Sequence, residues 1–178
     1  MPLENTFRDL TDALRRLRDN VAAVQLTARE DAPAEGSVMA VDALSDAVDD
    51  ALGWVEESLV CASAAQAAVG NPPDFQRARL QLARGNERFH CFRQKYSADL
   101  VSYERLYELM AFSKRRSGEW QAWAQSVRRG LDECGPPIEA VSRALLDCWQ
   151  ELAERTGGPS VSVQNNLSRL VAQRLGNP

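Results

Sequence analysis

The chain has 178 residues, of which 44% are hydrophobic and 26% charged, and its formal net charge is −4 at pH 7. These values are typical of a globular domain with one sizeable core and argue against global disorder. The longest nearly uncharged stretch, 58–71, is too short for a membrane span, and the N-terminus lacks the pattern of a secretory signal. We therefore expect a cytoplasmic protein with one domain at 1–160 and a tail at 161–178, which is either a short helix or an extended arm.

The stretch from Leu3 to Ala28 predicts a long helix with a heptad seam. Its apolar residues alternate spacings of four and three, whereas the neighbouring charged residues fall off this stripe. The seam consists of Leu3, Phe7, Leu10, Leu14, Leu17, Val21, Val24 and Ala28. Burial of these side chains alone does not offset the entropy lost when the helix orders, so the seam needs a partner. That partner is another helix of the chain or a second copy in a homodimer.

A second long helix is predicted from Val38 to Val69, after a loop at 31–37. Its apolar stripe contains Val41, Val48, Leu52, Val55, Leu59, Ala62 and Val69, with Ser45 and Gln66 as weaker positions. We expect Trp54 at the edge of the core. From Glu30 to Asp74 the chain has ten acidic residues and no Lys or Arg, so this helix carries a strongly negative surface.

Residues 70–74 contain signals that end one helix and begin the next. Gly70 suits the left-handed position after a helix. We expect Asn71 to cap the third helix and Pro72 to occupy its first position, with Asp74 near the positive end of the helix dipole. This is the clearest helix boundary in the sequence.

The third helix places large side chains at every seventh position from Phe75 to Tyr96, with small residues between them. We expect a neighbouring helix to approach closely at Ala78 and Gly85. The interval 97–102 offers capping residues, and we expect the helix to break there.

The remaining helices follow in short order. A fourth segment begins at Tyr103, residues 117–118 mark a kink or a turn, and 135–137 (Gly-Pro-Pro) repeat the stop and start signal before a last helix that ends at 155–160. The fold class predicted is all-α: an up-and-down antiparallel bundle of five or six helices, with long, coiled-coil-like N-terminal helices.

Catalytic and metal-binding motifs are weak. Glu87-x-x-His90 has the spacing of one ligand pair of a di-iron bundle, but the usual site needs a second pair and His90 is the only histidine. A haem meets the same shortage of ligands. The sequence has no nucleophile elbow, no glycine-rich phosphate loop and no Cys-x-x-Cys pair, and we interpret its four cysteines as buried thiols. We therefore predict no catalytic residue, no metal and no cofactor.

Asn86, His90 and Arg93 form a polar cluster on the third helix, which we place at the edge of the core. Such a cluster usually sets helix register or meets a carboxylate, here one from the acidic second helix. The functional alternative is a contact with a ligand or a partner.

The basic charge of the chain gathers between 76 and 129, where 12 basic residues stand against 5 acidic ones. If this block meets the acidic one inside the bundle, the two neutralise each other. If the blocks lie on opposite faces, the molecule is polarised and can dock an acidic partner on its basic side. The candidate partner-binding residues are Lys114, Arg115, Arg116, Arg128 and Arg129.

Nucleic acid is the alternative partner for this segment, because Trp120 and Trp123 lie between its basic clusters and could stack on bases. Against it, both Trp residues share a core-like register with Val127, and the sequence pI is about 5.1. We therefore predict a non-enzymatic bundle that mediates protein–protein interaction, as an adaptor, a regulator or a subunit of a bacterial assembly.

Overall fold

The computed structural model describes residues 3–33, 38–114 and 118–157. Its elements in chain order are α1 (Leu3–Glu30), α2 (Val38–Ala68), α3 (Phe75–Lys95), the π-helical turn η1 (Tyr96–Leu100), α4 (Tyr103–Lys114), α5 (Gly118–Glu133) and α6 (Gly135–Thr156). The described part contains helices and no strands, so the predicted all-α fold class is confirmed. None of the described helices combines the length and apolar character that a membrane-spanning helix needs.

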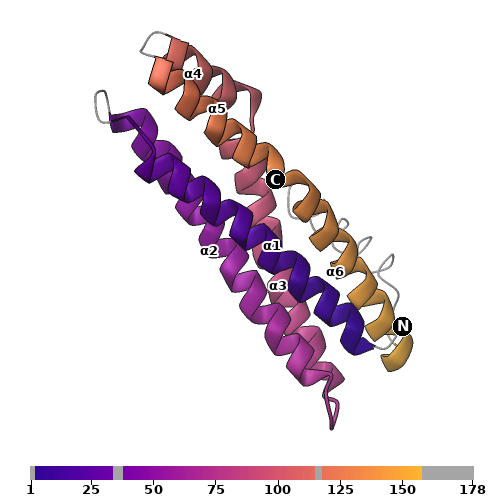
Figure 1. The fold of residues 1–178 in the computed structure, drawn as a ribbon. Helices are drawn as coiled ribbons and strands as arrows, with labels where there is room; N and C mark the ends of the chain where they lie inside the picture. The colour runs from indigo at the N-terminus through magenta and orange to yellow at the C-terminus, as the bar shows by residue number, and fades with distance from the viewer. Residues whose placement is uncertain (1–2, 34–37, 115–117, 158–178) are drawn as a thin grey trace.

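The helices form an elongated bundle (Figure 1). The hairpin of α1 and α2 is antiparallel, α3 runs back along α2, and α6 packs against α1 and α3, which closes a four-helix bundle around the N-terminal part of α1. Towards the other end, α5 lies along α1, and α4 packs antiparallel to α5. The helices α5 and α6 follow one another along the same side of α1, so the chain changes helix there without reversing direction.

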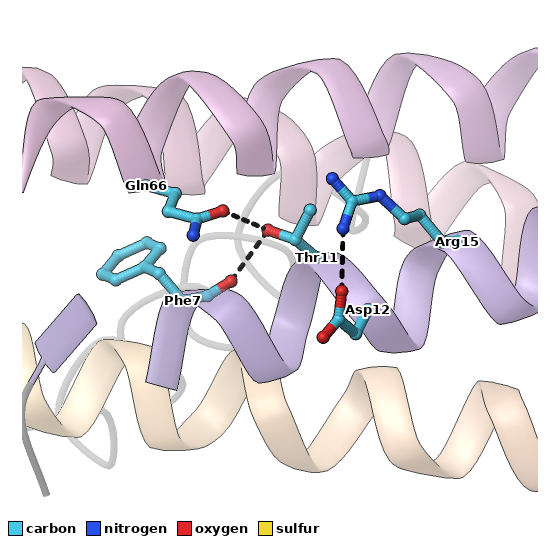
Figure 2. A network of polar contacts seen from close by, with 5 residues as sticks. All are labelled: Phe7, Thr11, Asp12, Arg15 and Gln66. Atoms are coloured by element: carbon cyan, nitrogen blue, oxygen red, sulfur yellow. Dashed lines mark hydrogen bonds and ion pairs between the residues drawn. The ribbon is translucent and has the colours of Figure 1, made fainter. Parts of the chain in front are cut away.

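The heptad seam of α1 is confirmed, because all eight of its residues are buried. Within this apolar surface Thr11 is also buried, and its hydroxyl makes hydrogen bonds with the Phe7 carbonyl at 2.8 Å and with the side chain of Gln66 at 3.1 Å. Figure 2 shows this link between α1 and α2 beside the exposed ion pair of Asp12 and Arg15, whose atoms are 2.7 Å apart. Gln66, a weak point in the apolar stripe of α2, therefore has a specific polar partner on α1.

The helix α2 buries two faces, one against α1 and one against α3. Besides the predicted stripe, small residues on α2 are buried, and these are Ala47, Ala51, Ser58 and Ala65. A Cβ atom placed on Gly85 of α3 would lie 3.1 Å from the Cβ of Cys61, and the Ser58 hydroxyl donates a hydrogen bond to the Gly85 carbonyl at 3.0 Å. Ala78 is fully buried as well. The predicted close approach of a neighbouring helix is therefore confirmed, and the neighbour is α2.

The start of α3 differs from the prediction. The N-cap is Asp74, whose Oδ1 accepts a hydrogen bond from the backbone N–H of Arg77 at 2.9 Å, and the helix begins at Phe75. Asn71 as the cap and Pro72 as the first helical residue were wrong. The cap lies past both prolines, at the residue whose carboxylate reaches the backbone N–H three positions further on.

The left-handed conformation predicted for Gly70 was also wrong, because Gly157 is the one described glycine with a positive φ. The break near residue 100 and the boundaries of the last helix fall where the sequence predicts them. The π-helical turn η1 begins at Tyr96, one residue before the expected interval 97–102, and the chain leaves the helical conformation at Val101 within that interval. The chain reverses direction between the end of α4 and the start of α5 at Gly118, because the two helices pack antiparallel, and residue 117 lies outside the described residues. The helix α6 begins at Gly135 with proline in its first turn and ends at Thr156, and its C-cap Gly157 has a left-handed φ of 62°. The tail predicted at 161–178 lies outside the described residues.

Candidate partner-binding surface

The helix α5, which carries Arg128 and Arg129, is fixed to the bundle by hydrogen bonds at both ends. Near its start, the indole Nε1 of Trp123 donates a hydrogen bond to the carbonyl of Thr27 in the last turn of α1, at 2.9 Å. Near its end, the hydroxyl of Tyr96 in η1 donates to the carbonyl of Leu131 at 2.7 Å. Burial raises the pKa of Tyr96 to about 12, so this hydroxyl keeps its proton at neutral pH. These contacts fix the orientation of α5 on the bundle.

The inner face of α5 packs tightly on α1. A Cβ atom placed on Gly130 would lie 2.9 Å from Cγ2 of Val24, so only glycine fits at the present helix spacing. Trp120 and Trp123 are 3% and 4% exposed and pack edge to face with ring centroids 5.4 Å apart. The predicted core-like register of both Trp residues is confirmed. Because their rings face the core, they offer no exposed surface on which a nucleic-acid base could stack.

The outer face of α5 is exposed along its length. Its exposed residues are Gly118, Glu119, Gln121, Ala122, Gln125, Arg128, Arg129, Asp132 and Glu133. The Arg128 Nε lies 3.9 Å from a carboxylate oxygen of Asp132, and Arg129 forms no ion pair with another described residue. Exposed pairs at this distance contribute little stability, so both guanidinium groups remain available to a partner.

The remaining predicted partner-binding residues cluster where α4 ends. Lys114 is the last residue of α4, and its side chain, like Arg115 and Arg116, lies outside the part that the structure describes. The position of Lys114 in the chain nevertheless assigns it to the same α4–α5 hairpin as Arg128 and Arg129. We call this hairpin, with the basic segment from Lys114 to Arg129, the basic hairpin.

The acidic and basic blocks meet in part. On the α2–α3 interface, Arg88 Nε lies 2.9 Å from an oxygen of Glu57, and Lys95 Nζ lies 3.1 Å from an oxygen of Asp50. Hydrogen bonds from the Lys95 ammonium to Asp99 and Asp50 raise the pKa of Lys95. These two carboxylates of α2 therefore form ion pairs with residues of α3. A third carboxylate of α2, that of Asp49, forms an ion pair with Arg29 of α1. Among the described residues, these α2 ion pairs do not involve the arginines of α5.

The polar cluster of Asn86, His90 and Arg93 lies on the exposed face of α3 and not at the edge of the core. Within the described ranges, none of the three side chains makes an ion pair or a hydrogen bond. The cross-helix contacts with α2 come instead from Arg88, whose guanidinium also lies 5.1 Å from the ring centroid of Trp54 at the core edge, and from Lys95. The three residues therefore form an open polar surface on α3.

Metal-binding and thiol chemistry have little support in the described part of the chain. Glu87 and His90 are exposed, and no three His, Cys, Asp or Glu side chains there come close enough to hold a metal ion. All four cysteines are free thiols. Cys134 and Cys148 are buried, whereas Cys61 and Cys91 are half-buried. Burial raises the pKa of the Cys134 thiol to about 12, which keeps it in the unreactive protonated form at neutral pH.

No family model, curated protein or solved structure matches this chain significantly. The helix α5 combines an inner face that is fixed to the bundle with an outer face that exposes the neighbouring arginines Arg128 and Arg129.

Sequence reasoning missed an acidic cavity between α1 and α6. Asp147, Glu151 and Glu154 follow one another at spacings of four and three on α6, and Asp9 of α1 joins them across the helix interface. The spacing on α6 is readable in the sequence. The contribution of Asp9 is not, because it depends on which helix packs against α6.

Proposed function

We propose that this protein is a non-enzymatic interaction module, and that its basic hairpin docks an acidic surface of a partner protein. The observation that supports this most is the pair of exposed guanidinium groups of Arg128 and Arg129 on a helix whose inner face is locked to α1. A rigid surface loses little conformational entropy when it binds, so its charges contribute to affinity more fully than charges on a mobile loop. The partner-binding residues are Lys114, Arg115, Arg116, Arg128 and Arg129.

Arginine suits this role chemically. The guanidinium group offers donors in a planar fork that pairs with a carboxylate through two hydrogen bonds, and it is less strongly hydrated than an ammonium group. Arg128 and Arg129 stand on the same outer face as Gln121 and Gln125, whose amides can complete a polar interface. The chain as a whole is acidic, so a cationic patch that is held apart from the acidic helix α2 gives the molecule a defined binding orientation.

A photo-crosslinking amino acid at Gln125 tests the proposal, since this position is exposed among the arginines. We expect it to capture a protein in cells whose contact surface is rich in Asp and Glu, and Glu139, which is exposed on α6, serves as the control position. The affinity of the purified pair should fall about tenfold or more in the variant Arg128→Gln with Arg129→Gln.

The control variant Arg77→Gln with Arg84→Gln removes the same charge from exposed positions on α3 and should bind as the wild type does. An equal loss in both variants would show that net charge alone matters and would contradict the proposal. Capture of RNA or DNA at Gln125, with affinity that falls steeply with salt, would favour the nucleic-acid alternative. Capture of a second copy of this chain would make the surface a homodimer interface.

A further inference from the structure

The helix α6 carries a second row of apolar and small side chains beside the row that it buries. The buried row contains Val141, Leu145, Cys148 and Leu152. The second row lies about one residue further along the helix, and it consists of Ser142, Leu146, Trp149, Ala153 and Thr156. Its alternating spacings of four and three are those of a seam along which one helix packs on another. We call these five residues the second seam.

The second seam is only partly covered within the described part of the chain. Leu146 is 49% exposed, and Ser142, Trp149 and Ala153 are half-buried. A single exposed leucine needs no explanation, but Leu146 lies one turn from both Ser142 and Trp149, so these side chains form a continuous strip. Trp149 also packs against the core. A strip with this spacing and composition is a suitable surface for a further helix.

The second seam faces the side of α3 that carries Arg79. Arg79 Nη1 donates a hydrogen bond to the hydroxyl of Thr156, at the end of the seam, over 3.3 Å. Residues seven apart share a side of a helix, so Asn86 and Arg93 lie on the same side of α3 as Arg79. Both are exposed, and their side chains make no ion pair or hydrogen bond with another described residue. The helices α3 and α6 therefore meet at Thr156 and leave the side above it open.

The chain continues from the lower end of the second seam. Gly157, with its left-handed φ of 62°, ends α6 there, and the next two residues are Gly and Pro. Further on, Leu167, Leu170, Val171 and Leu175 have the spacing of one apolar helix face, with Asn before them as a possible cap and Gly176 after them. A helix as short as 167–175 is not stable alone in water, so its apolar side needs a surface to pack on.

The second seam fits this segment in length, reach and charge. At about 1.5 Å per residue, 167–175 would be roughly 12 Å long, and the seam from Ser142 to Ala153 is roughly 16 Å long. The nine residues 158–166 span up to roughly 30 Å, which is enough for the chain to turn back along α6. Residues 158–178 contain two arginines and no acidic residue, whereas α6 contains four acidic and two basic residues. Their charges are therefore complementary.

We propose that the second seam is the docking site of the C-terminal segment of this chain, and that 167–175 packs there as a helix antiparallel to α6. Leu167, Leu170 and Val171 cover Leu146 and Trp149, and the exposed side chains of Asn86 and Arg93 form the polar rim on the side of α3. This site is separate from the basic hairpin, and neither proposal requires the other.

An apolar photo-crosslinking amino acid at Leu170 of the full chain, at a dilute concentration, tests where this segment lies. We expect crosslinks within one molecule, which mass spectrometry assigns to residues 142–153. The control position is Gln173, on the opposite side of the expected helix, and it should give far fewer of them. Crosslinks from Leu170 to another part of the chain would overturn the proposal, as would equal yields from both positions. Crosslinks mainly between two molecules would overturn it too and assign the second seam to a second copy.

Thermal unfolding of the full chain tests the same contact without a probe. Leu146→Gln should lower the melting temperature by about 3–5 °C, because it removes apolar area that the docked helix covers. Leu26→Gln is the matched control, since Leu26 of α1 is 54% exposed and both changes have similar helix propensity. It should change the melting temperature by less than about 1 °C. In a Leu170→Gln background the effect of Leu146→Gln should fall to less than half. Equal effects of Leu146→Gln and Leu26→Gln, or no coupling to Leu170→Gln, would overturn the proposal.

Discussion

The indole Nε1 of Trp123 donates a hydrogen bond to the carbonyl oxygen of Thr27, 2.9 Å away, although the two residues are 96 positions apart in the chain. Thr27 lies in the last turn of α1, where backbone carbonyls have no acceptor role left inside the helix. The Trp123 side chain thus caps α1 from α5. The same indole that suggested a base-stacking surface in the sequence is a structural link between two helices.

We predict that Trp123→Phe lowers the free energy of unfolding by about 1–2 kcal/mol, because the Thr27 carbonyl loses its donor while most of the apolar burial remains. Urea unfolding measures this loss. Trp149→Phe, at a partly buried position on α6, is the matched control and should cost less. Equal losses in the two variants would mean that ring size and not the hydrogen bond determines the effect.

Adding a side chain at Gly130 should destabilise the protein. The Cβ of Gly130→Ala would lie 2.9 Å from Val24, and we expect a loss of about 1–3 kcal/mol in unfolding free energy despite the higher helix propensity of alanine. Gly53, also inside a helix, has no atom within 4 Å of an added Cβ, so Gly53→Ala should stabilise the protein by about 0.5–1 kcal/mol. In a Val24→Ala background the cost of Gly130→Ala should shrink, and a double-mutant cycle that shows no coupling would contradict the packing explanation.

The cap of α3 can be tested by removing either candidate side chain. Asp74→Ala should lower the free energy of unfolding by about 1 kcal/mol, since the Arg77 amide loses its acceptor. Asn71→Ala, at an exposed position outside the helix, should change it by less than about 0.5 kcal/mol. Chemical denaturation of both variants measures the two losses of unfolding free energy. A larger loss in Asn71→Ala than in Asp74→Ala would show that Asn71 is the N-cap.

Stability should decline in alkaline solution because of buried protons. The pKa of the Cys134 thiol rises from 9.0 to about 12 in the folded protein, chiefly through burial. Between these values the unfolded chain has released this proton and the folded chain retains it, so stability is fully present below about pH 9 and falls towards pH 12. Burial of Cys148 and Tyr96 acts in the same direction.

The variant Cys134→Ser should flatten this decline in part. Its hydroxyl can still donate to the Gly130 carbonyl, which the thiol contacts at 3.4 Å, but it does not titrate in this range. Urea unfolding at a series of pH values from 8 upwards measures the slope, with Cys91→Ser as the control. An unchanged slope in Cys134→Ser would show that other groups account for the whole decline.

Periodicity predicted most of the fold because one side of each helix is buried. The seam of α1, the apolar register of α5 and the glycine and proline boundaries of α6 follow from local sequence, and the structure confirms them. The second buried face of α2 did not stand out, since it consists of Ala and Ser. Small residues of this kind indicate a buried helix face only when the neighbouring helix is known to approach closely, as α3 does at Gly85.

The candidate sites were less predictable, because they depend on which helices become neighbours. Arg88 and Lys95 form ion pairs with the acidic helix α2, whereas His90, which lies between them in the sequence, is exposed to solvent. The number of charged residues in each segment does not determine which of these side chains contacts α2. Likewise, Asp9 of α1 lies near Asp147 of α6 only because these two helices pack together. The two residues are 138 positions apart in the sequence.

This pairing of α1 with α6 also affects how the protein is made. The Cys148 thiol contacts the carbonyl of Thr6 at 3.5 Å, so the first helix to be synthesised completes its burial only against the last described one. At roughly 5–20 residues per second, a ribosome needs on the order of ten seconds to add the intervening chain. Throughout that interval the side of α1 that meets α6 has no native cover, which makes the nascent chain a natural client for chaperones.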